Sequence, residues 1–190
     1  SFYIGKHAPE PLIVKENNVN FAIYLNDGAM VGVFLDQKDV RKSIKNLYSK
    51  GKTVLNTFSY TGAFSMAAAK GGAVTTSVDL ASRSLEKTRE NFTINNIDYN
   101  EHEIVVEDIF VYFKEAKKKE LKFDVVILDP PSFATSKDNR FIAAKDYKDL
   151  VKLAIDVTKD EGVIVCSTNC ATFNMAKFKK FIDDAFKESN

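Results

Sequence analysis

The sequence predicts an α/β domain built on a parallel, doubly wound sheet. From residue 52 onwards, short apolar segments alternate with longer segments in which apolar residues recur every three or four positions. The short segments carry uninterrupted apolar runs such as VVIL, as expected for strands that are covered on both faces. The chain has 190 residues, which is the size of one domain with a small additional element.

The additional element is expected at the N-terminus as a small antiparallel β-hairpin or meander. Asn26-Asp27-Gly28 is a hairpin signal because an Asp-Gly pair tolerates positive φ angles. After Asp36 the apolar residues follow a helical spacing instead. We therefore predict an appendage over 1–36 and a core over 37–190. The strand-like segments of the appendage are 12–16, 19–25 and 29–35, and the apolar positions of the first helix are Val40, Ile44, Leu47 and Tyr48.

The elements of the core follow in regular alternation. The expected strands are 52–58, 73–79, 102–107, 123–129 and 162–168. The expected helices are 62–70, one with Ala81, Leu85, Thr88 and Phe92 on one face, and then 109–119, 143–158 and 174–188. In such sheets ligands bind at the carboxyl ends of the strands, so the residues that directly follow the strands are the candidate site.

The turn after the first core strand, NTFSYTGAFS (56–65), disfavours cofactors that carry phosphates. A dinucleotide-binding turn needs G-x-G-x-x-G so that the backbone can approach a pyrophosphate. Only Gly62 is present here, while Phe58 and Tyr60 occupy the space that a diphosphate needs. The lysine of a nucleoside triphosphate loop is missing as well. A cofactor with adenosine and no phosphate, namely S-adenosylmethionine, fits this turn better than NAD or FAD.

Acidic residues at the next two strand ends agree with an adenosine ligand. Asp79 lies at about the distance past the first turn where a ribose-binding acid occurs in doubly wound folds. Asp108 ends the third strand, where its carboxylate could accept from an adenine amino group with Ile109 against the ring. Each acid alone is also a common helix N-cap, so the pair carries the argument.

The fourth strand ends in VILDPPSFATSK (125–136), a rigid turn rich in hydrogen-bond acceptors. Proline cannot extend a strand ladder, so the strand stops at Asp129. Asp129 and the carbonyl of Pro130 could accept from the amino group of a base, while Phe133 stacks on its ring. The basic residues that follow could meet phosphates, although each alone is typical of a solvated surface: Lys137, Arg140, Lys145 and Lys148.

These motifs together resemble the class I S-adenosylmethionine-dependent methyltransferases. Within them the chain is similar to the bacterial 23S ribosomal RNA large-subunit methyltransferases of the cytosine-5 methyltransferase I type and to the related guanine-N7 enzyme. The resemblance spans nearly the whole chain and rests on five segments in the same order: GVFLDQKDVR (32–41), VLNTFSYTGAFS (54–65), VDLASRSLEKTREN (78–91), DPPSFA (129–134) and STNCATF (167–173).

The resemblance implies a Rossmann-like fold and a set of site residues. Phe58, Tyr60 and Gly62 would surround the methionine and sugar of the cofactor, and Asp129 would lie at the reaction centre with Pro130 and Phe133. The full cofactor set that it implies is Gln37, Arg41, Phe58, Ser59, Tyr60, Gly62, Asp79, Leu80, Asp108, Ile109 and Asp129.

The chain departs from the family pattern in two places. In the cytosine-5 enzymes a cysteine after the fifth strand is expected to attack the base, and our alignment puts Asn169 there with Cys170 one residue later. Asn169 would then contact the target base, and transfer to a nitrogen stays open beside a nucleophilic role for Cys170. The second departure is length, since the sheet of the family continues with two more strands. We therefore expect a truncated core whose activity alone is uncertain.

Composition excludes few partners. The 27 Lys and Arg balance 26 Asp and Glu, so no strong overall field selects a polyanion. Cys166 and Cys170 are the two cysteines, which favours a reduced, cytoplasmic compartment, and no segment is long and apolar enough for a membrane helix. No metal is expected, because no Cys and His cluster is present. The expected partner is ribosomal RNA, with a homodimer possible. The alternatives are a methyltransferase for a protein or small-molecule amine, and a binding module without catalysis.

Overall fold

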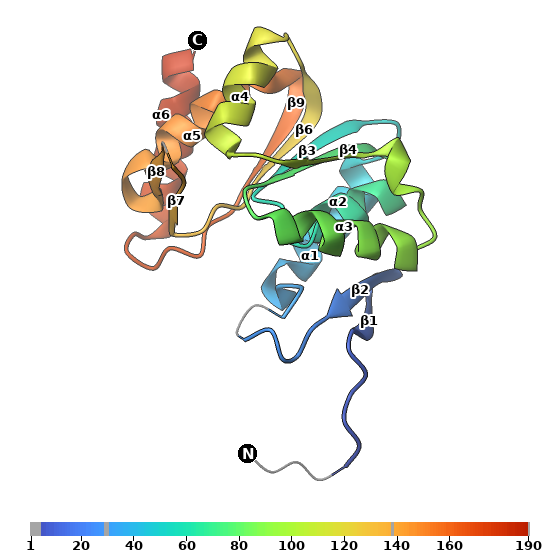
Figure 1. Cartoon of the computed structure of the whole chain (residues 1–190). Helices are drawn as coiled ribbons and strands as arrows, with labels where there is room; N and C mark the ends of the chain where they lie inside the picture. The colour runs from blue at the N-terminus through green and yellow to red at the C-terminus, as the bar shows by residue number, and fades with distance from the viewer. Residues whose placement is uncertain (1–4, 29–30, 138, 190) are drawn as a thin grey trace.

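The computed structural model describes residues 5–28, 31–137 and 139–189 and contains a central parallel sheet (Figure 1). Its strands, in the order in which they lie side by side, are β5 (Glu103–Val106), β4 (Val74–Asp79), β3 (Thr53–Thr57), β6 (Phe123–Leu128) and β9 (Thr158–Cys166). All four pairings are parallel, and the chain changes direction across the sheet between β3 and β6. The predicted doubly wound fold is confirmed.

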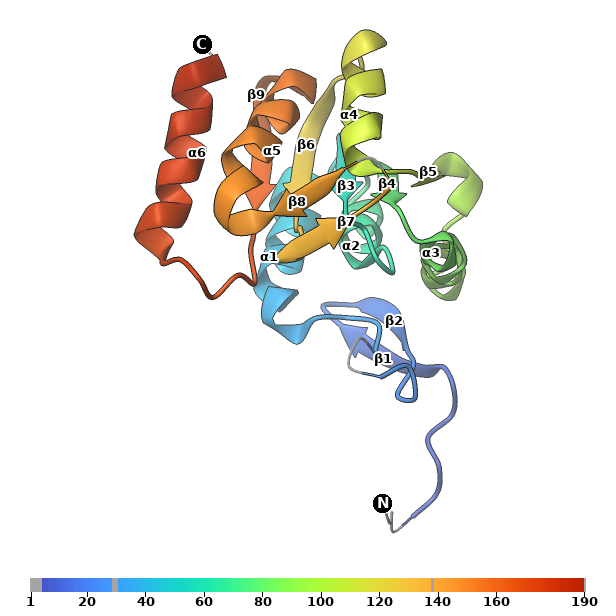
Figure 2. The same ribbon diagram turned by 60° about the vertical axis from the view of Figure 1, so that its left-hand side comes forward.

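Helices cover both faces of this sheet, because successive residues of each strand point to opposite sides (Figures 1 and 2). Val54 and Val125 pack with Ile44 on one face, whereas Leu55 and Val126 belong to the larger cluster on the other. The first face carries α1 (Lys38–Ser43) with the π-helical turn Ile44–Tyr48, α2 (Ala63–Lys70) and α3 (Ser82–Ile94); the second carries α4 (Ile109–Lys118), α5 (Ala143–Val157) and α6 (Met175–Ser189). Short 3-10 helices lie at Leu35–Gln37 and Tyr99–Glu101.

The N-terminal pair of strands, β1 (Leu12–Glu16) and β2 (Val19–Ile23), is antiparallel. Asn17 and Asn18 form its turn with φ angles of 50° and 64°, which asparagine tolerates better than most residues. Phe21 of β2 is buried in a cluster with Met66 and Phe92, so the pair packs on α2 and α3. The predicted small antiparallel element is confirmed, while the boundary between 36 and 37 stays a prediction.

The third expected strand, 29–35, is wrong where the structure describes it. Residues 31–34 are irregular, and a short 3-10 helix begins at Leu35; residues 29 and 30 lie outside the described part. Gly32 explains the difference, because its φ of 136° leaves strand geometry and its carbonyl accepts from the Thr61 hydroxyl. Leu47 and Tyr48 are also exposed, so they lie off the predicted buried face of their helix.

A second small element was not predicted from the sequence. β7 (Phe133–Thr135) and β8 (Arg140–Ile142) form an antiparallel hairpin directly after the two prolines, and Figure 2 shows both strands near the end of β6. Phe141 on its inner face is buried, with its ring centroid 6.2 Å from that of Phe58 and 6.0 Å from that of Phe110. The hairpin is therefore packed onto the core.

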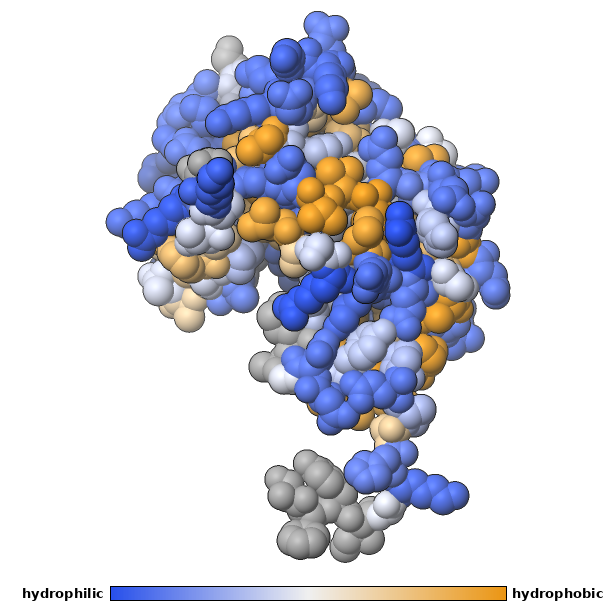
Figure 3. All heavy atoms as spheres, in the orientation of Figure 1, coloured by the Kyte–Doolittle hydropathy of each residue, from blue (hydrophilic) through white to orange (hydrophobic). Residues whose placement is uncertain are grey.

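The surface is mainly hydrophilic on the side seen in Figure 1, and hydrophobic side chains gather near its middle between α3 and α4 (Figure 3). Leu80 and Val106 are among the exposed large hydrophobic residues. Within the described ranges, no helix combines the length and the apolar character that crossing a membrane requires.

Gly62 is needed for close packing at the start of α2. Its φ is 72°, and a Cβ at this position would lie 2.6 Å from Thr88 Cγ2. We expect Gly62→Ala to lower the free energy of unfolding by about 2–4 kcal/mol, measured by urea denaturation, since the backbone strain and the overlap add. Gly51→Ala is the matched control, because Gly51 has a φ of 68° and no atom within 4 Å of the added carbon. Equal losses in the two variants would contradict the packing argument.

Candidate functional site

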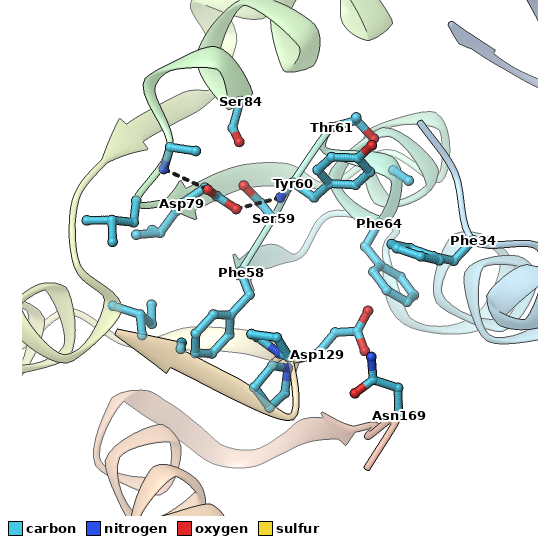
Figure 4. Close-up of a pocket in the computed structure, with 18 of the residues that line it drawn as sticks. Phe34, Phe58, Ser59, Tyr60, Thr61, Phe64, Asp79, Ser84, Asp129 and Asn169 are labelled. Atoms are coloured by element: carbon cyan, nitrogen blue, oxygen red, sulfur yellow. Dashed lines mark hydrogen bonds between the residues drawn. The ribbon is translucent and has the colours of Figure 1, made fainter. Parts of the chain in front are cut away.

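A cavity of about 590 Å³ lies at the carboxyl end of the sheet (Figure 4). Its walls are the loops after β3, β4, β5, β6 and β9, together with the segment 32–41 and the β7–β8 hairpin. Twelve of the predicted site residues line it: Gln37, Arg41, Phe58, Ser59, Tyr60, Asp79, Leu80, Asp108, Ile109, Asp129, Pro130 and Asn169. Gly62, Phe133 and Cys170 are not among the lining residues.

The loop after β3 is held in a strained conformation against the cavity. Phe58 and Tyr60 have φ angles of 51° and 52°, which are unfavourable for bulky residues. Hydrogen bonds fix the loop in place: the N–H of Ser59 donates to the carbonyl of Val78 at 3.0 Å, and the N–H of Tyr60 donates to Asp79 Oδ2 at 2.8 Å. These hydrogen bonds offset the strain and keep two aromatic side chains at the rim of the cavity.

Asp79 lies at the end of β4 and still has acceptor capacity toward the cavity. Besides Tyr60 N–H on Oδ2, its Oδ1 accepts from the N–H of Ala81 at 2.9 Å. A carboxylate offers about four acceptor positions, so two of them are used by these bonds. Figure 4 shows both bonds and the carboxylate beside Ser59. Asp79 thus suits a ligand with neighbouring hydroxyl groups.

Asp108 has a different environment from Asp79. It caps α4 through Phe110 N–H at 2.8 Å, and its other oxygen accepts from Ser136 Oγ and from Asn139 Nδ2 at 3.0 Å. Burial alone would raise the pKa of Asp108, but the hydrogen bonds from Ser136, Asn139 and the backbone lower it below its usual value. The carboxylate predicted to contact adenine therefore also holds the tip of the β7–β8 hairpin.

Arg41, predicted at the polar end of the cofactor, is engaged in a buried ion pair. Its Nε and Nη2 each donate to Glu16 at 2.8 Å, and Nη2 also donates to the carbonyl of Phe34 at 2.9 Å. The guanidinium lies 5.7 Å from the ring centroid of Phe21. Through these contacts Arg41 connects β1, β2 and the segment around Phe34. Arg41 also lines the cavity. Gln37 lies half-buried at the start of α1 and lines the same wall.

Asp129 follows β6 and points into the cavity from the side opposite Asp79 (Figure 4). Ser167 Oγ donates a hydrogen bond to its Oδ1, and the Tyr147 hydroxyl donates to the carbonyl of Ser167 at 2.7 Å. Burial raises the pKa of Asp129, the bond from Ser167 opposes that rise, and the charge of Asp36 adds to it. Ser167 was missed from the sequence because it was placed inside the fifth strand.

Ser167→Ala tests this arrangement. Loss of the hydroxyl removes a bond to the ionised carboxylate, so the pKa of Asp129 should rise further. If an ionised Asp129 is needed for activity, the acid limb of the pH profile of kcat/KM moves to higher pH in the variant. Ser132→Ala is a control, because Ser132 bonds Asn169 on the same rim at 2.8 Å and leaves Asp129 untouched. An unmoved acid limb in Ser167→Ala would contradict the role of this bond.

Asn169 lines the cavity, and Cys170 does not. Asn169 Oδ1 accepts from Ser132 Oγ, which orients the amide beside Asp129. The side chain of Cys170 packs against the core cluster, and its Sγ lies 3.1 Å from Thr172 Oγ1. The hydrogen bond with Thr172 lowers the pKa of Cys170. Cys170 is not among the residues that line the cavity.

Cys166, Phe133 and Gly62 lie outside the lining of the cavity. Burial raises the pKa of Cys166 to about 11, as expected for a thiol packed among core side chains. Phe133 is 52% exposed on β7, so it lies on the outer surface of the hairpin instead of inside the cavity. Gly62 contributes backbone geometry at the start of α2, as described above.

Sequence reasoning missed several lining residues. Phe34 and Phe64 form an aromatic wall opposite Asp79, and Phe34 lies 5.9 Å from Tyr60 between ring centroids. Thr61 and Ser84 also line the cavity, and Figure 4 shows Ser84 on the side of Asp79. All four lie in segments that carried the family resemblance, 32–41, 54–65 and 78–91, but none of them was assigned a role. In the part of the chain that the structure describes, no group of three or more His, Cys, Asp or Glu residues is arranged to hold a metal ion.

Comparisons with known proteins agree on one family. The model of the S-adenosylmethionine-dependent methyltransferases matches residues 4–179. A Bacillus subtilis (strain 168) protein, provisionally named ribosomal RNA large subunit methyltransferase YwbD, is 60% identical over the whole chain, which covers 48% of that relative. Ribosomal RNA large subunit methyltransferase I of Aeromonas salmonicida (strain A449) is 36% identical over 95% of the chain and 46% of the relative.

Solved structures agree with these relatives. The crystal structure of SMU.776 complexed with SAH has a TM-score of 0.92 and 46% identity, covering 97% of this chain and 48% of that one. The structure of a Streptococcus mutans protein, provisionally named a SAM-dependent methyltransferase, has a TM-score of 0.90 and 43% identity. The match covers 99% of this chain and 49% of that one. The chain spans about half the length of the curated relatives it matches.

Proposed function

The chain belongs to the family of S-adenosylmethionine-dependent methyltransferases, and we propose that it transfers a methyl group to a nitrogen atom of a base in ribosomal RNA. The observation that carries the proposal is the arrangement of Asp79 and Asp129 on opposite sides of one cavity. The first is suited to a ribose, and the second forms part of an acceptor corner. The names of the relatives support an RNA substrate.

The residues of the cavity fit the cofactor of the family. Asp79 keeps acceptor positions for ribose hydroxyl groups, and the side chains of Phe58 and Ile109 offer apolar contact to a flat ring. The loop with Phe58 and Tyr60 leaves no glycine-rich turn for a pyrophosphate. When bound, S-adenosylmethionine supplies an electrophilic methyl group on a sulfonium. The chain itself then has to hold the acceptor in line with that group and exclude water.

The acceptor corner is formed by Asp129, Pro130 and Asn169. Asp129 would accept from an amino or ring N–H group of the base, and the Asn169 amide, oriented by Ser132, would bond another edge. An ionised Asp129 in a half-buried setting makes a strong acceptor for such a donor. These roles bind and orient the base, which is the main contribution that a reactive methyl donor leaves to the protein.

A nitrogen acceptor is favoured over carbon 5 of cytosine by the position of Cys170. Covalent activation of cytosine needs a thiolate at the base, whereas Cys170 packs against the core cluster and is not a lining residue. A ring nitrogen such as guanine N7 carries its own lone pair and needs no such attack. Of the two acceptors that the sequence left open, guanine N7 is therefore the one we propose.

The test is mass mapping of ribosomal RNA from cells that lack the gene. Loss of one methylguanine, restored by the wild-type gene and by a Cys170→Ala variant, would support the proposal. Loss of a 5-methylcytosine that Cys170→Ala fails to restore would overturn the nitrogen acceptor. A labelled-methyl assay on ribosomal RNA and on protein extract would separate RNA from a protein or amine substrate, and methylation of protein alone would overturn the RNA substrate.

A further inference from the structure

The outer face of the β7–β8 hairpin pairs an exposed aromatic ring with an arginine. Phe133 is 52% exposed, and the guanidinium carbon of Arg140 lies 5.2 Å from the centroid of its ring. Arg140 is itself exposed and stands opposite Thr135 in the register of the hairpin. The opposite face of the hairpin carries the buried Phe141, so the hairpin has a core face and a free face. We call Phe133 and Arg140 the hairpin platform.

The hairpin platform adjoins the mouth of the cavity. Thr135, two residues from Phe133 on the same strand, lines the cavity, and so does Asn139, next to Arg140. Two strand residues span roughly 7 Å, which places the Phe133 ring close beside the opening. The hairpin is also fixed by the bonds from Ser136 and Asn139 to Asp108, so the platform has a defined position relative to the site.

The chemistry of the hairpin platform is that of a nucleotide-stacking surface. Bases of single strands stack on aromatic rings and on guanidinium planes, and cationic side chains nearby bind the phosphates. Lys137 lies between Phe133 and Arg140 in sequence, Lys145 follows them, and both lysines are exposed. Taking the described residues alone, no carboxylate forms an ion pair with Lys137, Arg140 or Lys145, since each of the eight ion pairs involves other cations. Among the described residues, these three cations are therefore not engaged by carboxylates and can meet phosphates.

We infer that the hairpin platform stacks an unpaired nucleotide next to the target base, outside the cavity. The inference rests on the proposed RNA substrate and adds a specificity site to it. Phe133 supplies the stacking face, and Arg140 supplies a second plane and a charge for the adjoining phosphate. The target base in the cavity and its neighbour on the platform would thus be held apart in an unstacked strand.

The test is binding of a labelled single-stranded RNA oligonucleotide, followed by fluorescence anisotropy over a range of salt concentrations. Phe133→Ala should weaken binding about 5- to 100-fold without changing its salt dependence, since a stack is lost and no charge. Arg140→Ala should weaken binding and lower the slope of log K against log salt by about 0.7, whereas Arg140→Lys should restore the slope but not the affinity. Phe186→Ala is the matched control, because Phe186 is 43% exposed on α6.

Calorimetry with S-adenosylhomocysteine checks that each variant keeps its cavity, and its affinity should stay at the wild-type value. RNA binding by Phe133→Ala equal to that of Phe186→Ala would overturn the platform while leaving the proposed methylation of RNA intact. A wild-type protein that methylates no RNA would overturn the proposed function and the platform together. A change of self-association in Phe133→Ala, measured by sedimentation without loss of RNA binding, would instead make the platform an interface between two copies and overturn the inference.

Discussion

Replacing Asp79 by asparagine is expected to lower the affinity for S-adenosylhomocysteine about 10- to 100-fold. If Asp79 binds the ribose as proposed, the variant loses charge-assisted hydrogen bonds, each of which contributes about 1.5–3 kcal/mol. It also turns an amide NH₂ toward the N–H of Tyr60 or of Ala81, where the carboxylate now accepts at 2.8 and 2.9 Å. Isothermal titration calorimetry measures the change directly.

Asp98→Asn is the matched control for this experiment. Asp98 also accepts from a backbone N–H, that of Asn100 at 2.9 Å, but it lies in an exposed turn outside the cavity. Its replacement should leave the affinity unchanged. Equal affinity of Asp79→Asn and wild-type protein would show that ribose recognition does not depend on the end of β4, and the assignment of the cavity would then fail.

Replacing Asp129 by asparagine is expected to abolish most of the methyl transfer, by about 100-fold or more in kcat, while the affinity for S-adenosylhomocysteine is retained. The reason is that asparagine keeps the size of the side chain and one acceptor oxygen but loses the negative charge that we propose holds the base. A labelled-methyl assay on ribosomal RNA measures the loss. Activity close to the wild-type value would remove Asp129 from the reaction centre.

The same variant is expected to be more stable than the wild type at pH 7. Burial, the largest cause, raises the pKa of Asp129 above its ordinary value of 3.8, so the folded state holds this proton more tightly than the unfolded chain. The stability that this group contributes is therefore present below pH 3.8 and is lost as the pH rises through the folded value. The gain in Asp129→Asn should appear in thermal unfolding at pH 7 and vanish at low pH.

Asp124→Asn provides a control of opposite sign. Burial would raise the pKa of Asp124, but bonds from Lys159 at 2.8 Å, from the Thr53 N–H at 2.9 Å and from Lys52 lower it far below the usual value. Its contribution is present above the ordinary aspartate pKa and is lost on acidification. Asp124→Asn should thus lose stability at pH 7, and a shared sign for the two variants would contradict the environments described here.

Much of this architecture was predictable because it depends on local patterns. The apolar runs of β3 and β6 and the helical spacing between the strands predict a parallel, doubly wound sheet, and that fold is confirmed. The positions of Asp79 and Asp129 at strand ends follow from the same rule, since the carboxyl ends of parallel strands share one edge. Their contacts with a cofactor and a base stay predictions.

The contacts that the sequence did not reveal join residues that are distant in sequence. Arg41 pairs with Glu16, a residue 25 positions earlier, and no local pattern indicates this contact. Phe133 faces outward because β7 pairs with β8. The sequence did not reveal this hairpin, so it could not show on which face the Phe133 side chain lies. Asp108 was recognised as an acid at a strand end, but its bonds to Ser136 and Asn139 came from that same hairpin.

The buried pair between Arg41 and Glu16 has a consequence for how this protein can be shortened. A variant that begins after β1 would lack Glu16. The Arg41 guanidinium, which is 2% exposed and lies near the rings of Phe21 and Phe64, would then be buried without its ion-pair partner. An isolated buried charge costs several kcal/mol, so such a version would be expressed in a weakened or unfolded form. β1 and β2 are for this reason needed for the stability of the core that follows them, although the spacing of apolar residues changes after Asp36.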